Sequence, residues 1–157
     1  PGTGDVQMTL TQKFDVTGAV IVSTPQDVAL IDARKGIDMF NQLGTPIIGM
    51  IENMSTHICS NCGHEEHTFG HGGVAAEAAK LGVPLLAELP LHLDIRLAAD
   101  GGAPIVVSKP DSTSAQAFRA VARALQIVRQ DQVICIAGSL YVVGEAMQTL
   151  QQMGLMK

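Results

Sequence analysis

The chain has 157 residues, of which 46% are hydrophobic and 16% charged, and its formal net charge is −5 at pH 7. This length is enough to bury one hydrophobic core, so one compact unit is the simplest expectation. The ten basic residues are scattered and supply no clustered positive surface, so a nucleic-acid partner is not expected. Because no apolar run approaches the roughly 20 residues of a membrane span and no signal peptide is visible, we expect a soluble cytoplasmic protein without a membrane partner.

Apolar strands and amphipathic helices alternate along the chain. The continuous apolar runs are rich in β-branched residues, which is typical of strands covered on both faces. The patterns predict helices over residues 6–13, 28–43, 72–81 and 112–128, and strands over residues 18–23, 46–51, 84–89 and 133–137, with a last helix after residue 137. Alternation of this kind predicts an α/β fold with a mostly parallel sheet and right-handed crossovers.

The helix predicted over residues 28–43 has the clearest amphipathic pattern. Residues 24–27 contain residue types that favour a helix N-terminus, and Gly44 is placed to end the helix. Spacings near three and four predict a buried stripe made of Val28, Ile31, Ile37, Phe40 and Leu43.

Residues 57–73 interrupt the alternation. This 17-residue segment is crowded with His, Cys, Gly and acidic residues and has almost no apolar ones. We expect an irregular insert, and a long irregular insert in a compact domain is usually functional or mobile.

Two cysteines of this insert, Cys59 and Cys62, form a CxxC pair followed by Gly63, which can adopt the positive φ of a tight turn. Soft thiolate ligands suit zinc, copper(I) and iron-sulfur clusters. Two thiolates satisfy none of these alone. The missing ligands come either from histidines of the same segment, which suits tetrahedral zinc, or from a second chain, which gives the four thiolates of an iron-sulfur cluster. The candidate histidines are His64, His67 and His71.

A redox role for the pair is less favoured, because a thioredoxin-like CxxC should open a helix that lowers the thiol pKa. The residues after Cys62 are instead typical of a loop. The third cysteine, Cys135, lies in an apolar run and is predicted to be a buried core residue.

Several segments occur together in an order that is highly specific. They are PGTGDVQ (1–7), VSTPQDVA (22–29), GMIENMS (49–55), CSNC (59–62), FGHGG (69–73), LGVP (81–84) and PLHLDIR (90–96). Over residues 1–128 they resemble the Mrp/ApbC family of iron-sulfur carrier ATPases, in the MinD/ParA-like branch of P-loop proteins. The resemblance implies part of a doubly wound, mostly parallel sheet of the P-loop NTPase type.

The same resemblance implies a function for the cysteines. In that family paired cysteines of two subunits hold one 4Fe-4S cluster, which the carrier passes to apo-proteins. Cys59 and Cys62 are then the ligands, a homodimer is the expected assembly, and apo iron-sulfur proteins are the partners. The resemblance favours a bridged cluster over zinc. Ser60 stands where many members have a proline, which affects loop stiffness rather than ligation.

Members of the family also use ATP and magnesium. By resemblance Gly2, Gly4 and Asp5 form a switch segment near the γ-phosphate, while Asn53 and Pro90 lie on the adenine side. An Asn amide can pair with an adenine edge. No GxxxxGK[ST] sequence occurs in the chain, so the phosphate cradle is missing and the chain alone is predicted to be inactive as an ATPase. The alternative is an enzyme that hydrolyses ATP when a separate P-loop-bearing polypeptide completes it.

The C-terminal part departs from this family. Residues 130–157 resemble the last strand and helix of folylpolyglutamate synthases, which divides the chain into residues 1–128 and a strand-helix tail, 129–157. A strand, turn and helix that close the α/β sheet are the other interpretation. Because strands of the related fold are missing from the sequence, we expect uncovered sheet edges and self-association.

Overall fold

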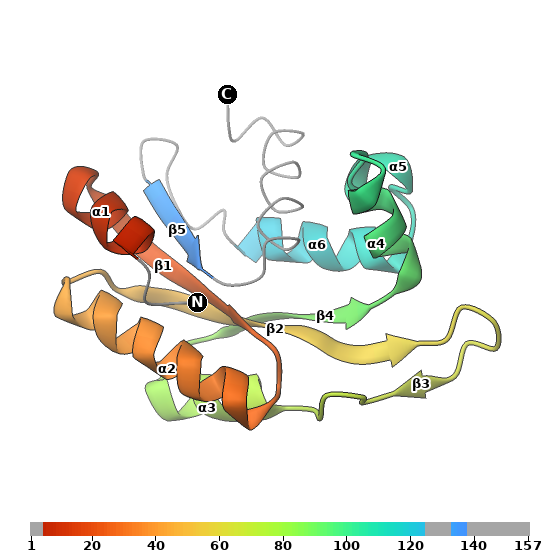
Figure 1. Ribbon diagram of the computed structural model, residues 1–157, viewed down its shortest axis with the longest axis horizontal. Coiled ribbons are helices and arrows are strands. Elements are labelled where there is room, and N and C mark those ends of the chain that lie inside the picture. Colours follow the sequence, from red (N-terminus) through yellow and green to blue (C-terminus); the bar gives the residue numbers. More distant parts are fainter. Residues whose placement is uncertain (1–4, 125–132, 138–157) are drawn as a thin grey trace.

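The structure, a computed structural model, describes residues 5–124 and 133–137. Its helices are α1 (Asp5–Lys13), α2 (Asp27–Gln42), α3 (Gly73–Leu81), α4 (Leu93–Asp100), α5 (Ile105–Ser108) and α6 (Thr113–Ala124), and its strands are β1 (Val16–Ser23), β2 (Ile47–Ile58), β3 (Glu65–Glu66), β4 (Leu85–Leu91) and β5 (Val133–Ala137) (Figure 1). The order confirms the predicted alternation of strands and helices. Among these described helices, none has the length and apolar character needed to cross a bilayer.

The sheet is mostly parallel, as predicted. β1 lies between β5 and β2 and pairs in parallel with both, and β4 pairs in parallel with the other edge of β2. Only β3 is antiparallel, and it pairs with the last residues of β2. At that end His57 pairs with Glu66 of β3 and with Leu91 of β4, so β2 continues well beyond the point where β1 stops.

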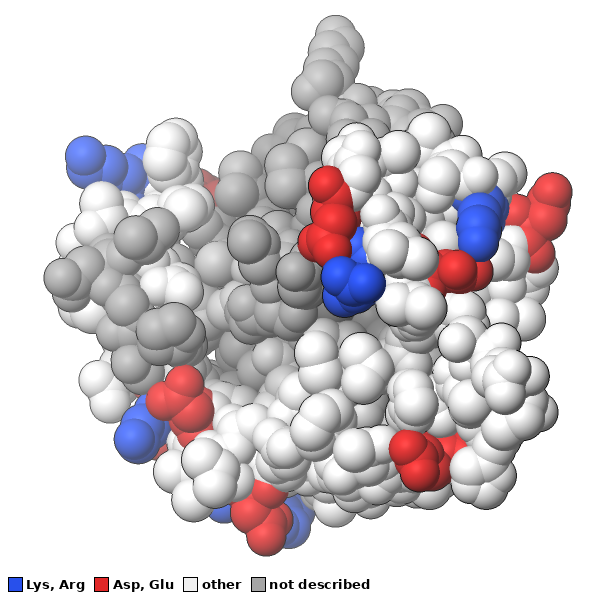
Figure 2. All heavy atoms as spheres, turned by 45° about the vertical axis from the view of Figure 1, so that its right-hand side comes forward, with Lys and Arg blue, Asp and Glu red and all other residues white. Residues whose placement is uncertain are grey.

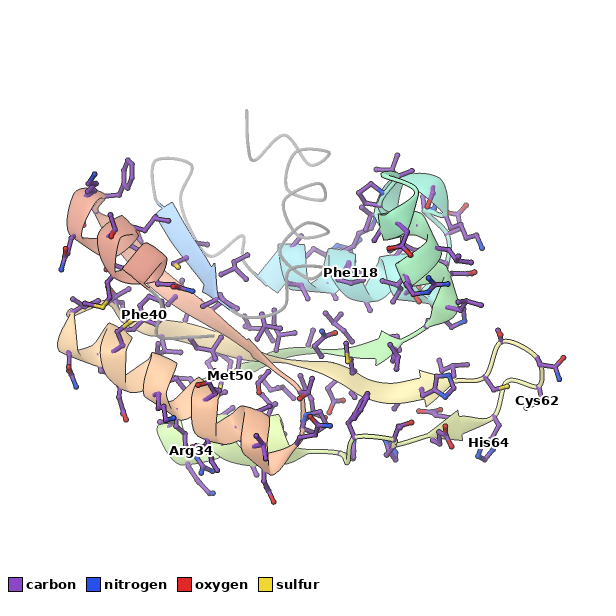
Figure 3. The ribbon with its side chains drawn as sticks, in the orientation of Figure 1. Arg34, Phe40, Met50, Cys62, His64 and Phe118 are labelled. Carbon is purple, nitrogen blue, oxygen red and sulfur yellow. The ribbon has the colours of Figure 1, made fainter. Side chains whose placement is uncertain are left out.

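Two hydrophobic clusters cover the two faces of the sheet. α2 and α3 lie over one face, with Phe40 and Met50 between helix and sheet, whereas α6 brings Phe118 to the opposite face (Figure 3). The strands serve both clusters because side chains alternate along a strand. In β1, for example, Ile21 belongs to the first cluster and Val22 to the second. The continuous apolar pattern of the strands is thereby explained.

Helix α2 forms where it was predicted, but its buried stripe differs. Leu30, Ile37 and Phe40 are buried, whereas Val28 is 80% exposed and Ile31 is 51% exposed. The predicted spacing of three to four residues is correct. At the N-terminal end of the helix, however, Leu30 faces the sheet in place of Val28 and Ile31. The expected cap is also absent, since the N-cap residue Gln26 makes no side-chain capping bond.

The prediction of an irregular insert over residues 57–73 is wrong for the first part of that segment. β2 extends to Ile58 instead of ending near residue 51, and β3 returns against it, so the segment begins as a hairpin. Two further helices, α4 and α5, form over residues 93–108, where no element was predicted.

β5 confirms the predicted strand at residues 133–137, with Cys135 buried as expected. The end of the helix predicted over residues 112–128 lies outside the described residues, as do the final helix and most of the tail that resembles folylpolyglutamate synthases.

Candidate functional site

The two cysteines lie at the tip of a projecting hairpin, residues 55–68, which we call the arm (Figure 3). The tip is a compact turn. The backbone N–H of Cys59 donates to the carbonyl of His64 at 2.9 Å, and the N–H of Gly63 donates to the carbonyl of Cys59 at 2.9 Å. Gly63 has a φ of 72°, a conformation that glycine adopts without steric cost. Cys59 is half-buried, Cys62 is exposed, and both are free thiols.

The turn favours the thiolate form of Cys59. Backbone N–H groups of Asn61 and Cys62 hydrogen-bond its sulfur and lower the pKa of the thiol below its ordinary value, and the Cys62 side chain and His57 add to this. Desolvation opposes the shift to a smaller extent. Since a thiolate is the form that ligates metals, the tip is prepared for soft metal ions.

The histidines of this region make other contacts. His57 pairs with Glu66 at 3.0 Å, and this bond lowers the pKa of the Glu66 carboxyl. The Nδ1 of His67 is 2.9 Å from the carbonyl of Ser55. The His67 and His71 rings stack, with centroids 4.4 Å apart.

Neither cysteine has a third ligand nearby in residues 5–124 and 133–137. In that part of the chain, one group of at least three His, Cys, Asp or Glu side chains has its ligand atoms within 4.8 Å of one another. The group consists of Glu52, His71 and Glu88, and it contains no cysteine. The arm thus presents two thiols without the histidines that a zinc site would need.

The base of the arm is fixed by a buried carboxylate. Glu52 is fully buried in β2, and its two oxygens accept the backbone N–H groups of Gly72 at 3.1 Å and Val74 at 2.9 Å, where α3 begins. Gly73 lies so close to α2 that an added Cβ would be 2.5 Å from the carbonyl oxygen of Pro25. The FGHGG segment therefore owes its glycine at residue 73 to close packing. Sequence reasoning had no signal for Glu52, because the predicted strand ended at residue 51 and Glu52 fell just outside it.

A pocket of about 200 Å³ opens beside the carboxyl end of β4 and the part of β2 just beyond the last residue paired with β1. Ligands of α/β proteins commonly bind at this edge of the sheet. The structure brings the predicted residues Asn53 and Pro90 together in its lining, which also includes Met54, Leu91, His92, Ile95, Arg96 and Phe118. Sequence reasoning did not find the last six, because they come from α4 and α6 as well as the strands.

Met54 explains how two successive strand residues can line one pocket. Neighbouring side chains of a strand point to opposite faces. Met54 has a φ of 56°, which is rare for a residue with a side chain, and the pairing of β2 with β4 shifts its register just after Asn53. The local irregularity breaks the alternation and turns both side chains toward the pocket.

The remaining predicted residues are not brought to this pocket by any described contact. Gly2 and Gly4 lie outside the described residues, and Asp5 is the first residue of α1. Helix α1 and the pocket helix α4 lie at opposite ends of the molecule (Figure 1).

The face shown in Figure 2 carries separated basic groups rather than a basic patch, and several of them adjoin acidic groups. Ion pairs of this kind in the structure include Lys109 with Asp94 at 2.7 Å and Arg96 with Asp100 at 3.0 Å. Pairing of this kind gives this face no continuous positive surface.

Known proteins match most of this sequence. A ParA-type family profile described as NUBPL iron-transfer P-loop NTPase matches residues 1–126. The iron-sulfur cluster carrier protein of Escherichia coli K12 is 52% identical over 136 residues, which cover 85% of this chain and 37% of that protein. The iron-sulfur cluster transfer protein NUBPL of Mus musculus is 46% identical over 130 residues, covering 83% of this chain and 40% of that protein. The chain thus spans well under half the length of these relatives.

Solved structures show the same fold. A nucleotide-binding protein of Archaeoglobus fulgidus in complex with ADP has a TM-score of 0.59 and 36% identity, covering 71% of this chain and 45% of that one. The cell division ATPase MinD of Pyrococcus furiosus has a TM-score of 0.56 and 26% identity, covering 71% and 43%. The sheet and its helices are therefore similar to those of MinD-like P-loop NTPases.

Proposed function

This chain belongs to the NUBPL iron-transfer P-loop NTPase family, and on that premise we propose that it carries a 4Fe-4S cluster on Cys59 and Cys62 and passes it to apo-proteins. The observation that carries the proposal is the arm, which presents both thiols of one tight turn away from the hydrophobic core. A cluster held there is accessible to an acceptor protein without any opening of the core. The cluster is cargo in this mechanism, and the protein contributes ligation and presentation.

We infer that two copies share the cluster. A 4Fe-4S cluster takes four cysteine ligands, and one arm offers two. In the described part of the chain no His, Asp or Glu joins the cysteines in a ligand cluster. A two-fold dimer that brings two arms together supplies four equivalent thiolates from one repeated contact.

Zinc bound by Cys59, Cys62 and two histidines is the second candidate. His57, His67 and His71 are engaged elsewhere, so the arm would have to rearrange to recruit two of its histidines. The two candidates differ in colour, since zinc has a filled d shell and its sites are colourless, whereas an iron-sulfur protein absorbs visible light.

Anaerobic reconstitution with iron and sulfide tests the proposal. We expect about two iron atoms per chain, a brown absorption spectrum and a dimer on sedimentation. Cys59→Ser and Cys62→Ser should each lose the cluster. Ser60→Ala is the matched control in the same turn and should keep it. Equal iron in wild type and in the chain without both thiols would overturn the proposal, and stoichiometric zinc in place of iron would favour the second candidate.

The pocket is, in this proposal, the base end of a nucleotide site. Asn53 supplies an amide suited to an adenine edge, and Pro90 and Phe118 supply apolar surface. Gly2, Gly4 and Asp5 would contribute the switch segment near the γ-phosphate. Since the sequence has no GxxxxGK[ST], we propose that this chain hydrolyses ATP only together with a segment that supplies the phosphate loop and its magnesium ligand. Phosphate release by the purified chain alone, at the rate of a full-length relative, would contradict this.

The proposal also places the protein in the cytoplasm, where a reducing environment keeps exposed thiols such as Cys62 free. It keeps the division at residue 128, with residues 129–157 as a separate tail. Within that tail, β5 pairs with β1, so residues 133–137 belong to the sheet.

A further inference from the structure

Three side chains from separate segments converge at the base of the arm. Glu52 lies in β2, His71 lies just before α3, and Glu88 lies in β4. One ligand atom from each lies within 4.8 Å of the other two. The group is distinct from the cysteines. Six residues of β2 lie between Glu52 and Cys59, so the two are up to about 23 Å apart at about 3.3 Å per residue of strand.

The charge of this group is not balanced by a basic residue. Glu52 is fully buried, and both of its oxygens accept backbone N–H groups. In residues 5–124 and 133–137, no Lys or Arg nitrogen lies within 4.0 Å of the carboxylate of Glu52 or Glu88. A buried carboxylate is costly unless hydrogen bonds and positive charge accompany it. The N–H groups at the start of α3 supply part of this compensation, and a bound cation would add to it.

His71 is the basic side chain that lies nearest to Glu52 among the ion pairs of the described residues. Its Nδ1 is 3.8 Å from Oε1 of Glu52, and its side chain is 52% exposed. Two ligands of one ion at about 2.1 Å each can lie up to about 4.2 Å apart, so this pair already spans an ion site. The exposed His71 and Glu88 side chains can close the remaining gap by rotation, and they leave the ion a route from solvent.

A second histidine packs against the ring of His71. The ring centroids of His67 and His71 are 4.4 Å apart, and His67 itself donates from Nδ1 to the carbonyl of Ser55 at 2.9 Å, because a carbonyl can only accept. The His71 ring therefore contacts His67 while its Nδ1 lies near Glu52.

We propose that Glu52, His71 and Glu88 bind one divalent transition-metal ion, with water completing its coordination. One imidazole and two carboxylates suit zinc, manganese, cobalt(II) or iron(II), and they do not suit copper(I), which prefers sulfur. The ion neutralises the buried carboxylate and ties β2, the loop before α3 and β4 together beneath the arm. This inference rests on the three side chains at the base of the arm and does not depend on what the cysteines bind.

The test uses the full chain with Cys59→Ser and Cys62→Ser, so that no CxxC thiolate competes for the ion. Titration with zinc by calorimetry is expected to show one ion per chain. With cobalt(II) we expect visible ligand-field bands without the charge-transfer band of a cobalt-thiolate bond. His71→Ala and Glu88→Gln alter exposed side chains, and each should weaken binding about tenfold or more.

His64→Ala and Glu66→Gln are the matched controls, since they remove one imidazole and one carboxylate of the arm from outside the group. They should leave the zinc affinity unchanged. Absence of zinc binding, or equal affinity in the His71→Ala and Glu88→Gln double variant, would overturn the site. Either result leaves the iron content of the wild-type chain unaffected, so failure here is distinguishable from failure of the cluster proposal.

Discussion

The two ends of β2 are held by different kinds of interaction. Its first half lies between β1 and β4, with Met50 and Ile51 fully buried in opposite hydrophobic clusters. Its last residues pair with the two-residue strand β3 and lead into a turn stabilised by a few backbone hydrogen bonds. The first half of β2 therefore contributes to global stability, while the second half positions the turn that carries Cys59 and Cys62. Substitutions at the two ends should separate folding from cargo binding.

The largest contrast is expected between the core beside β2 and the arm tip. Phe40→Ala removes a fully buried ring that packs against the sheet and should lower the free energy of unfolding by about 3–5 kcal/mol. Cys62→Ser alters an exposed side chain and should change it by no more than about 0.5 kcal/mol, even though cluster binding is lost. Urea unfolding of the metal-free chains measures both. A loss of several kcal/mol for Cys62→Ser would show that the arm is part of the cooperative core.

A smaller but still large effect is expected at the base of the arm. Glu52→Ala removes the acceptor of the buried N–H of Val74, at about 1–3 kcal/mol for the unsatisfied group, and that of the half-buried N–H of Gly72, which water can reach at a smaller cost. Hydrogen exchange at these two amides should accelerate more than at amides of α2. Glu65→Ala, an exposed change in β3, is the control. Unchanged exchange at Gly72 and Val74 would mean that Glu52 does not fix the loop.

The sequence predicted the buried strands of the sheet better than the arm that extends from it. Buried parallel strands have a strong signature, because apolar residues on both faces leave an uninterrupted run, and β1 and the start of β2 were found for that reason. The far end of β2 has no such signature. Thr56 and His57 are polar and only partly covered, so the strand continues there because of its pairing with β3 and β4 rather than its composition.

The candidate site divides in the same way. Cys59 and Cys62 were identified because a local spacing of thiols has a specific chemical meaning. The pocket was found only in part. Asn53 and Pro90 came from a family resemblance, whereas Arg96 and Phe118 approach from helices distant in the sequence. Only the folded topology places them beside β2, and no local pattern records that proximity.

A more moderate effect is expected at the ion pair that joins α2 to α3. Arg34 of α2 donates two hydrogen bonds of 2.7 Å to the buried carboxylate of Glu77 in α3. These bonds lower the pKa of Glu77, so their contribution to stability is present above the unfolded pKa of about 4.3 and is lost as pH falls through the folded pKa. Arg34→Gln should destabilise the chain less than Glu52→Ala, because Arg34 is 47% exposed.

Thermal unfolding across pH measures this effect. The difference in Tm between wild type and Arg34→Gln should be constant near neutral pH and should shrink below about pH 4. Arg96→Gln, which removes an exposed helix pair with Asp100, is the control and should show a smaller difference throughout. A Tm difference that persists undiminished at pH 2 would indicate that packing of the Arg34 stem, and not its charge, holds α2 against α3.

The smallest effect is expected within the tip itself, where a single backbone N–H can be removed. Asn61→Pro eliminates the donor that contributes most to lowering the pKa of Cys59, whereas Asn61→Ala keeps that donor and changes only the side chain. The pH profile of Cys59 alkylation by iodoacetamide should therefore have a lower midpoint in the folded wild type than in the denatured chain. Asn61→Pro should move the midpoint upward and Asn61→Ala should not. An equal shift of the alkylation midpoint in both variants would show that the Asn61 side chain, and not the backbone of the turn, lowers the pKa of Cys59. The proposal that the turn prepares Cys59 for metal binding would then be wrong.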